Sequence, residues 1–534
     1  MARQWKEDRA QNPLMPQRIS DFIPPREISD KLVDSYFRTY ETMFRILHIP
    51  SFQKEYSQYW ENPAAANASF LMKLLLVLAI GTCFHEEFIN SLYKESLQWV
   101  NTAQAWLSSP GEKSRLNISC LQVHCLLLIA RQTSGVNGDL TWMSSGHLLH
   151  LAMTLGMHRD PMHFSKMSPF HREMRRRLWA TVLELVVQSS QDLGLAPLVS
   201  FEDHDCDPPS NIDDDQIGES ISTRPVPKPM TTFTQTTVQI ALFRSLNTRL
   251  KISKLINGAR SSPTYEDTLQ LDTELTSSIR SNTQLFQSYL LRENAKIRPT
   301  TFQIKFLDLL TRRFLILLHY PWFVEAKDNP RFYFSRKVCV ESSVVVLQHR
   351  IGGLLSRPET PATPDDFTLF MYLVRGGAND TLIHASMIIG LELVTLLEDE
   401  PRNLNPSMTA QFSMNSNQIS HLLVTFKSTL ELVQERLERG ETNVKAVIFV
   451  ACMIGQVEAQ LNGADPETAI IEAAKNSVQE CYELLKRMLG GISPKESSLV
   501  FPVGSEVVDS NSMMSWDLLV SSDSELSCLY NRTN

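Results

Sequence analysis

Paired cysteines, a signal-like N-terminus and a bilayer-length apolar run are all missing from this 534-residue sequence. Its eight cysteines, at positions 83, 120, 125, 206, 339, 452, 481 and 528, form no CxxC pair, which excludes a zinc ribbon and predicts reduced, mostly buried thiols. The N-terminal segment MARQWKEDRAQNP has no apolar core. The most apolar run, Phe70 to Phe84, contains Lys73 and is shorter than the roughly 20 residues of a bilayer span. We therefore expect a buried helix there and no membrane partner.

Positive charge is in deficit, with 51 Lys and Arg against 59 Asp and Glu and a formal net charge of −8. A chain that is acidic overall does not favour nonspecific nucleic-acid binding, so any DNA contact requires a local basic module. Gly-rich phosphate loops, the GxSxG elbow and the CxxCH motif are also absent from the sequence. We therefore expect that the protein is not an enzyme and that it has no catalytic or cofactor-binding residues.

What the sequence does contain is apolar residues at helical spacing, without sustained two-residue alternation. Near the N-terminus, Leu32, Tyr36, Tyr40 and Phe44 share one helical face. Similar patterns predict helices at about 68–84, 86–107, 114–133, 140–157, 170–193, 233–257, 264–291, 299–325, 331–355, 366–399, 415–438, 442–461 and 466–489. The prediction is an all-α fold of many helices with extended linkers and a disordered acidic C-terminal tail.

Breaks in these patterns predict four segments. They are a polar linker at 1–26, a first helical part at 27–220, a second helical part of the same region at 230–489, and an acidic, apolar-rich tail at 490–534. The two helical parts are separated by alternating Pro225, Pro227 and Pro229, which favour an extended, exposed connection.

The tail combines spaced carboxylates with large apolar side chains. The carboxylates are Glu506, Asp509, Asp517, Asp523 and Glu525, and the apolar residues include Met513, Met514, Trp516, Leu518, Leu519, Leu526 and Tyr530. This composition is typical of disordered activation segments, whose acidic groups keep the apolar ones solvated until a partner groove accepts them. We therefore predict that residues 500–534 form a coactivator-binding segment. The alternative is an inert end or a helix that docks back onto the core.

An ordered set of motifs lies between Trp142 and Ile217. A helix with Trp142, Gly146, Leu149, Met153 and Gly156 on one face, expected to pack closely at Gly146, ends in Leu155-Gly156-Met157-His158-Arg159-Asp160. It is followed by Arg176-Arg177-Leu178-Trp179, Gly194-Leu195-Ala196-Pro197 and Pro209-Ser210-Asn211-Ile212-Asp213-Asp214. Together with Ile46-Leu47-His48-Ile49-Pro50-Ser51-Phe52, which is expected to end the first helix, they resemble the middle regulatory region of the fungal zinc-cluster (Zn2Cys6) transcription factors. The resemblance is strong over about 28–220, and beyond 230 it rests on helical content alone.

The resemblance implies an all-helical regulatory domain of a nuclear transcription factor that controls RNA polymerase II transcription of a metabolic or secondary-metabolite gene set. It also implies a homodimer or heterodimer and, in some members, a small-metabolite effector. The family's six-cysteine zinc module is not in this sequence, so zinc and DNA contact are expected only through a module missing from the gene model or supplied by a partner. The alternatives are a modulator of another transcription factor that does not itself bind DNA, and a helical scaffold or enzyme unrelated to transcription.

Polar clusters in the motif region do not match known chemistry. His158-Arg159-Asp160 lacks the other kinase motifs and is expected to cap a helix end. His147 and His150 lack a third metal ligand at suitable spacing. The aspartates between Asp203 and Asp207 do not follow a calcium loop, and Asp213-Asp214-Asp215 lack the second cluster of a terpene cyclase. We expect no metal site.

Four arginines open the motif helix, at Arg172, Arg175, Arg176 and Arg177. They could form a nuclear-import or DNA-backbone patch. The favoured interpretation is structural. They would begin a buried helix that contains Trp179, and their guanidinium groups would pair with the acidic loop from Asp203 to Asp215.

Overall fold

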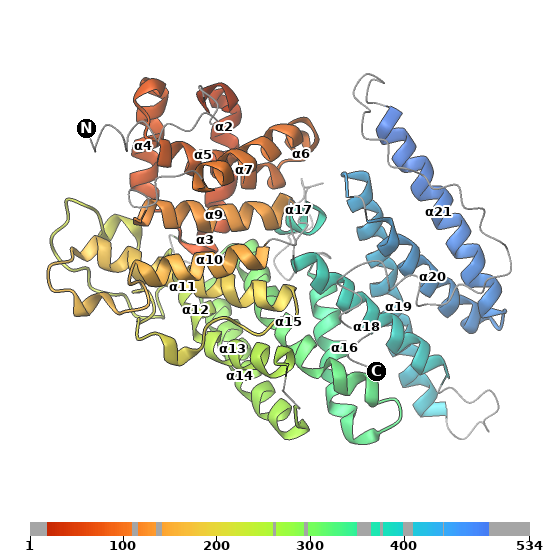
Figure 1. The fold of residues 1–534 in the computed structure, drawn as a ribbon. Coiled ribbons are helices and arrows are strands. Elements are labelled where there is room, and N and C mark those ends of the chain that lie inside the picture. The colour runs from red at the N-terminus through yellow and green to blue at the C-terminus, as the bar shows by residue number, and fades with distance from the viewer. Residues whose placement is uncertain are drawn as a thin grey trace.

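The computed structural model describes residues 19–108, 116–134, 141–259, 263–292, 297–349, 365–373, 377–398, 409–441 and 443–490. Within these ranges the chain forms α-helices and short 3-10 helices and no strand, which confirms the all-α prediction (Figure 1). Some predicted features lie outside the described residues. They are the side chain of Trp142, residues 1–18 of the predicted linker and the predicted tail beyond Gly490.

Helices make up most of the described chain, and the connection formed by residues 193–236 is long. In chain order they are α2 (Arg26–Arg38), α3 (Tyr40–Phe44), α4 (Ile49–Glu61), α5 (Ala68–Gly81), α6 (Glu86–Ser91), α7 (Tyr93–Ser108), α9 (Ile118–Ser134), α10 (Thr141–Thr154), α11 (Pro169–Asp192), α12 (Thr237–Arg244), α13 (Leu246–Asn257), α14 (Tyr265–Leu290), α15 (Thr301–Glu325), α16 (Tyr333–Gln348), α17 (Asp366–Leu373), α18 (Gly377–Glu398), α19 (Thr409–Glu438), α20 (Val444–Asn462) and α21 (Pro466–Gly490). Side-chain caps fix several starts, as at Thr264, Thr300 and Asp465, whose carboxylate accepts from the Thr468 backbone N–H at 3.0 Å.

Three groups of helices build the molecule (Figure 1). The N-terminal group, red to orange in the figure, packs α2, α7 and α9 around the apolar helix α5. The middle group contains α10 to α15, and α11 contacts helices of all three groups. In the C-terminal group, α16, α18, α19 and α20 pack against one another, and α21 lies at the outer edge against α20. One cluster of buried apolar side chains extends from Leu32 to Val457 and so joins the three groups.

Several local predictions were wrong. Residues 46–52 do not end the first helix, because α3 already ends at Phe44 and α4 begins at Ile49, with Pro50 in its first turn, where proline needs no N–H partner. The helix predicted at 86–107 is two helices, α6 and α7. The helix predicted at 233–257 is two helices that meet at Ser245. Residues 19–22 of the predicted linker form a 3-10 turn, and the Phe22 carbonyl accepts a hydrogen bond from the Trp99 indole at 2.7 Å.

Two glycines of the motif helix α10 also differ from the prediction. Gly156 is not on a packing face, because α10 ends at Thr154 and Gly156 terminates it with φ +70°. A Cβ on Gly146 would meet only the side chain of Leu198, at 3.2 Å. The close helix approach is instead at Gly81 of α5, where a Cβ would lie 2.8 Å from the carbonyl carbon of Leu32 in α2.

Two helices are long and apolar enough by composition to cross a membrane, namely α18 and α20. In the fold, α18 packs against α15, α16, α19 and α20, and half of its most apolar window is buried. Helix α20 lies between α19 and α21. These contacts are those of core helices.

Candidate functional site

The motif helix α11 carries a polar stripe along a side that the protein buries. The stripe consists of Glu173, Arg177, Thr181, Glu184, Gln188 and Asp192. Successive members are three or four positions apart, so they share one helical face. All but Asp192 are buried, and buried polar groups require hydrogen-bond partners. Each stripe residue finds that partner on another segment of the chain.

At the N-terminal end of the stripe, Asp214 lies between two buried guanidinium groups. Arg177 Nη1 donates to Asp214 Oδ1 at 2.6 Å, and Arg45 Nη2 donates to the same oxygen. The backbone N–H of Ile49 donates to Asp214 Oδ2 at 3.0 Å. Burial alone would raise the pKa of Asp214, but Arg45 and Arg177 outweigh it and hold that pKa well below its usual range. The acidic loop is thereby tied to both α11 and the start of α4.

Glu173 holds the neighbouring part of the same loop. Its carboxylate accepts from Arg177 Nε at 3.3 Å and from the backbone N–H of Ser210 at 3.1 Å. One residue further, the Asn211 side chain donates to the carbonyls of Lys228, Pro229 and Thr232 at 3.0–3.1 Å. The Pro-Ser-Asn phrase therefore anchors the proline-rich connection to the core.

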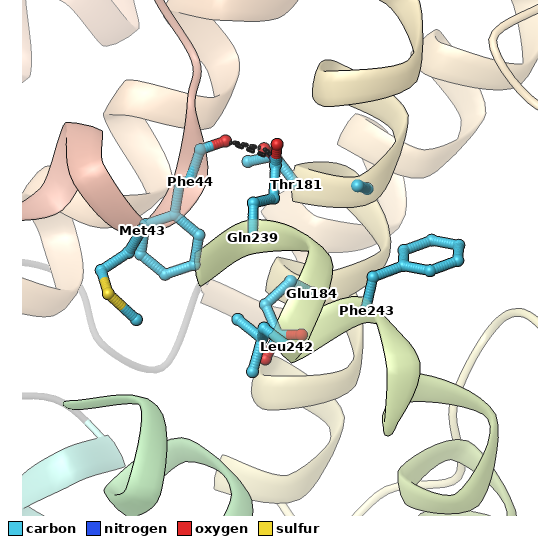
Figure 2. A pocket seen from close by; sticks show the side chains of 8 residues that line it. Met43, Phe44, Thr181, Glu184, Gln239, Leu242 and Phe243 are labelled. Carbon is cyan, nitrogen blue, oxygen red and sulfur yellow. Dashed lines mark hydrogen bonds between the residues drawn. The ribbon is translucent and has the colours of Figure 1, made fainter. Parts of the chain in front are cut away.

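The middle of the stripe meets α3 and α12 at a small void (Figure 2). The carbonyl of Phe44, at the end of α3, accepts hydrogen bonds from the Thr181 hydroxyl and from Gln239 Nε2, the latter at 2.8 Å. Gln239 also donates to Thr181 Oγ1 at 3.0 Å. The void beside them measures about 10 Å³, which is the space of one water and excludes a larger ligand.

The C-terminal end of the stripe binds α13 and α15. The carboxylate of Glu184 accepts hydrogen bonds from both terminal nitrogens of Arg249, each at 2.7 Å. Gln188 donates to Glu184 Oε1 at 2.7 Å and accepts from Arg313 Nη1 at 2.9 Å, and Arg313 Nη2 donates to Asp192 at 2.6 Å. The stripe therefore links α11 to five surrounding segments through fully or partly buried charges, a geometry that specifies how the helices are placed.

The structural interpretation of the four arginines is confirmed for Arg177 and only in part for the other three. Arg177 pairs with Asp214 in the acidic loop, as predicted. Arg176, however, binds mainly Asp160 of the His-Arg-Asp phrase, with three contacts of 2.8–3.1 Å, and reaches Asp207 only at 3.5 Å. Arg175 donates to the Leu155 carbonyl at 2.7 Å, and Arg172 donates to the carbonyls of Phe164 and Ser165. The His-Arg-Asp aspartate is thus a counter-ion of α11.

The three buried arginines Arg45, Arg249 and Arg313 were missed in the sequence. Arg45 lies inside the apolar run Met43-Phe44-Arg45-Ile46-Leu47. A lone charge inside such a run is a signal that could have identified Arg45, because a buried charge needs a buried partner. Arg249 and Arg313 have polar or charged neighbours in the sequence and carry no such signal.

Glu41, in α3, is an acidic group of this region whose pKa is raised. It is fully buried and accepts from the Tyr36 hydroxyl at 2.6 Å and from the backbone N–H of Leu47 at 3.0 Å. Burial raises the pKa of Glu41 to about 7, against the opposing effect of Arg45.

We expect Glu41→Gln to gain stability relative to the parent as the pH rises. Between pH 4.5, the ordinary value, and about pH 7 the folded protein binds a proton that the unfolded chain has lost, so the parent loses stability across that window. A glutamine has no proton to lose in this window. The free energy of unfolding of the variant, relative to that of the parent, should therefore rise by roughly 2–3 kcal/mol across it. Urea unfolding at both ends of the window measures it. Glu27→Gln, at an exposed position of α2, is the control and should show no such shift.

A surface cleft of about 310 Å³ lies at the start of α11. Its walls come from the first turns of α11, from the segment before that helix, and from residues 210 and 222–225. Three guanidinium groups border it, those of Arg172, Arg176 and Arg224, together with the apolar side chains of Met162 and Met167. We call it the arginine cleft. It is adjacent to the polar stripe, since Glu173 belongs to both.

Comparison with known proteins identifies this architecture. Residues 33–295 match the fungal specific transcription factor domain. The chain belongs to the family that carries this domain. Both the polar stripe and the arginine cleft lie within the matched residues. The family resemblance of the sequence motifs is therefore confirmed.

Relatives extend the similarity along most of the chain. "Transcription factor opdR" of Penicillium oxalicum is 37% identical over 90% of this chain and 61% of its own length. "Transcription factor lepE" of Aspergillus flavus is 34% identical over 88% and 56%, and the "Aspyridones cluster regulator apdR" of Emericella nidulans is 28% identical over 89% and 61%. The chain thus spans about three-fifths of the length of the curated relatives it matches. No solved structure matches it.

The domain's histidines, cysteines and aspartates are placed without a metal cluster among the described residues. His147 packs against His124, with ring centroids 4.9 Å apart. Burial is the main cause that lowers the pKa of His124 to about 4, and the charge of His147 is the second cause. His150 Nδ1 is 2.8 Å from the Gly146 carbonyl. The seven described cysteines are free thiols, and all but Cys452 are buried. Other relatives are named as Zn(2)-C6 fungal-type transcription factors, a name that refers to zinc in those proteins.

Proposed function

We propose that this chain is the regulatory part of a nuclear transcription factor and that it acts by binding partners rather than by catalysis. The observation that supports this most is the domain match over residues 33–295 together with relatives that align along about nine-tenths of the chain and are named as transcription factors. One of them is named as the regulator of a gene cluster, and we extend that role to a secondary-metabolite gene set here.

DNA contact would then come from a zinc cluster that precedes this chain or belongs to a dimer partner. The arginines that could have formed a DNA-backbone patch support this division of labour, because Arg176 and Arg177 are already paired with carboxylates inside the domain. Both homodimers and heterodimers would place a DNA-reading module beside this body.

We also propose that residues 27–220 and 230–489 work as one regulatory body. Glu184 of the first part binds Arg249 of the second, and Gln188 binds Arg313. Breaking the Glu184–Arg249 pair would leave a buried charge without its partner, so the two parts are expected to unfold together.

The tail supplies the test of the transcriptional role. Residues 500–534, fused to an unrelated DNA-binding domain, should raise the output of a reporter gene through coactivator binding. Replacing Trp516, Leu518 and Leu519 by Ala should abolish that gain, because apolar burial in a coactivator groove provides most of the binding energy.

Variants that neutralise Asp509, Asp517 and Asp523 while keeping the three apolar residues are the matched control, and they should lose less of the gain. Reporter output that stays at the level of the DNA-binding domain alone would contradict activation by the tail. Output that rises equally with and without the three apolar residues would contradict the groove-binding mechanism.

A further inference from the structure

The arginine cleft has a surplus of positive charge that the described carboxylates do not balance. Arg176 is neutralised by Asp160, and Glu173 is neutralised by Arg177. Arg172 and Arg224, in contrast, pair with no carboxylate in the part of the chain that the structure describes. Arg224 is exposed and has no hydrogen-bonded partner there either. Two uncompensated positive charges therefore face one cleft.

The position of the cleft strengthens this positive potential. It opens at the first turns of α11, a helix of 24 residues whose cap is Ser168. The peptide dipoles of such a helix leave partial positive charge at its N-terminus, which favours a bound anion. The two arginines and the helix end act in the same direction.

The cleft also has an apolar part beside its polar residues Glu173, Ser210 and Ser222. Met162 and Met167 contribute flexible thioethers, and Pro225 contributes a rigid ring from the opposite wall. Methionine side chains adapt to ligands of different shape. A volume of about 310 Å³ is at the small end of the range for organic ligands, and it is too large for a simple ion held by charge alone.

We propose that the arginine cleft binds a small organic anion, with a carboxylate directed at Arg172 and Arg224 and an apolar body on the two methionines. Its regulatory meaning rests on the proposed transcriptional function, whereas the binding itself does not. An occupant would touch Glu173 and Arg176, and these residues hold the acidic loop and the His-Arg-Asp phrase. Occupancy would therefore stabilise the N-terminal end of the polar stripe.

Calorimetric titration of the purified 534-residue chain tests the proposal. Octanoate and naphthoate are two carboxylates of different shape, and octanol and octylammonium are the neutral and cationic counterparts. At least one carboxylate should bind at a single site with a dissociation constant below about 1 mM, and the two counterparts should bind at least tenfold more weakly.

Single substitutions locate the site. Arg224→Gln and Arg172→Gln should each weaken carboxylate binding about tenfold or more, since each removes a charge-assisted contact. Arg172→Gln also removes hydrogen bonds to the Phe164 and Ser165 carbonyls, which can change folding stability. Arg224→Gln removes no such contact, so its effect on carboxylate binding is free of a folding defect. Arg280→Gln, at an exposed position of α14 away from the cleft, is the matched control and should bind like the parent.

Three results would overturn the proposal: no saturable binding of either carboxylate, equal affinity for octanol, or an Arg224→Gln variant that binds as the parent does. A silent reporter fusion would contradict the transcriptional role and leave this titration unchanged, so the two failures are distinguishable.

Discussion

Asp214→Ala should cost roughly 3–5 kcal/mol of folding stability, because it leaves Arg45 and Arg177 buried beside each other without their shared counter-ion. It also removes the acceptor of the Ile49 backbone N–H. Urea unfolding of the purified chain, followed by helical circular dichroism, measures the loss. If the variant does not accumulate as folded protein, the same comparison can be made with Asp214→Asn, which keeps the shape of the side chain and should lose less.

Asp215→Ala is the matched control, since Asp215 is the next residue, carries the same charge and is exposed, without an ionic partner among the described residues. It should change stability by less than about 0.5 kcal/mol. The double variant Asp214→Ala with Arg177→Met should lose clearly less than the sum of the single losses, because the second change removes one of the orphaned charges. Additive losses, or an Asp214→Ala variant as stable as Asp215→Ala, would contradict the shared counter-ion.

Trp179→Ala should cost about 3–5 kcal/mol, because it removes a large, fully buried side chain and leaves a cavity in the core. Its ring lies 5.5 Å from the ring of His204 and 6.3 Å from that of His158, measured between centroids, so the indole holds the His-Arg-Asp phrase and the acidic loop against α11. Chemical unfolding under the same conditions measures the effect.

Two further variants make this measurement specific. Trp179→Phe refills much of the space and should lose less than the alanine variant. Tyr333→Ala removes an aromatic ring that is 65% exposed, and it should change stability by less than about 0.5 kcal/mol. A Trp179→Ala variant that unfolds at the same denaturant concentration as Tyr333→Ala would show that Trp179 is not a core residue.

The fold class and most helices could be predicted from the sequence because apolar spacing depends only on neighbours within a few turns. Leu32, Tyr36, Tyr40 and Phe44 were placed on one face, and all four are buried. Even so, α2 ends before Tyr40, since a shared face does not require a continuous helix. Pro50 hid the start of α4 for a related reason, because proline both ends helices and opens them.

The polar stripe could be predicted only in part. Its residues on α11 are visible in the sequence, and the pairing of the motif arginines with the acidic loop was expected for Arg177. The partners themselves were not, because Arg45 is 169 residues from Asp214 and Arg313 is 125 residues from Gln188. Such pairs form only after the helices have packed, and no local pattern records them. The same holds for the arginine cleft, which brings Arg172 together with Arg224.

Glu184 shows the same limit. Its carboxylate is visible in the sequence of α11, but its partner Arg249 lies on α13, 65 residues further along the chain.

We expect that Arg176 and Arg177 of the motif helix serve ion pairs inside the domain and do not contact DNA. The binding of a duplex DNA by the purified 534-residue chain, measured over a salt series, tests this most directly. With a net charge of −8 and Arg176 and Arg177 already paired, binding should be weak and should disappear by physiological salt. Sequence-selective binding that persists at physiological salt would contradict the account.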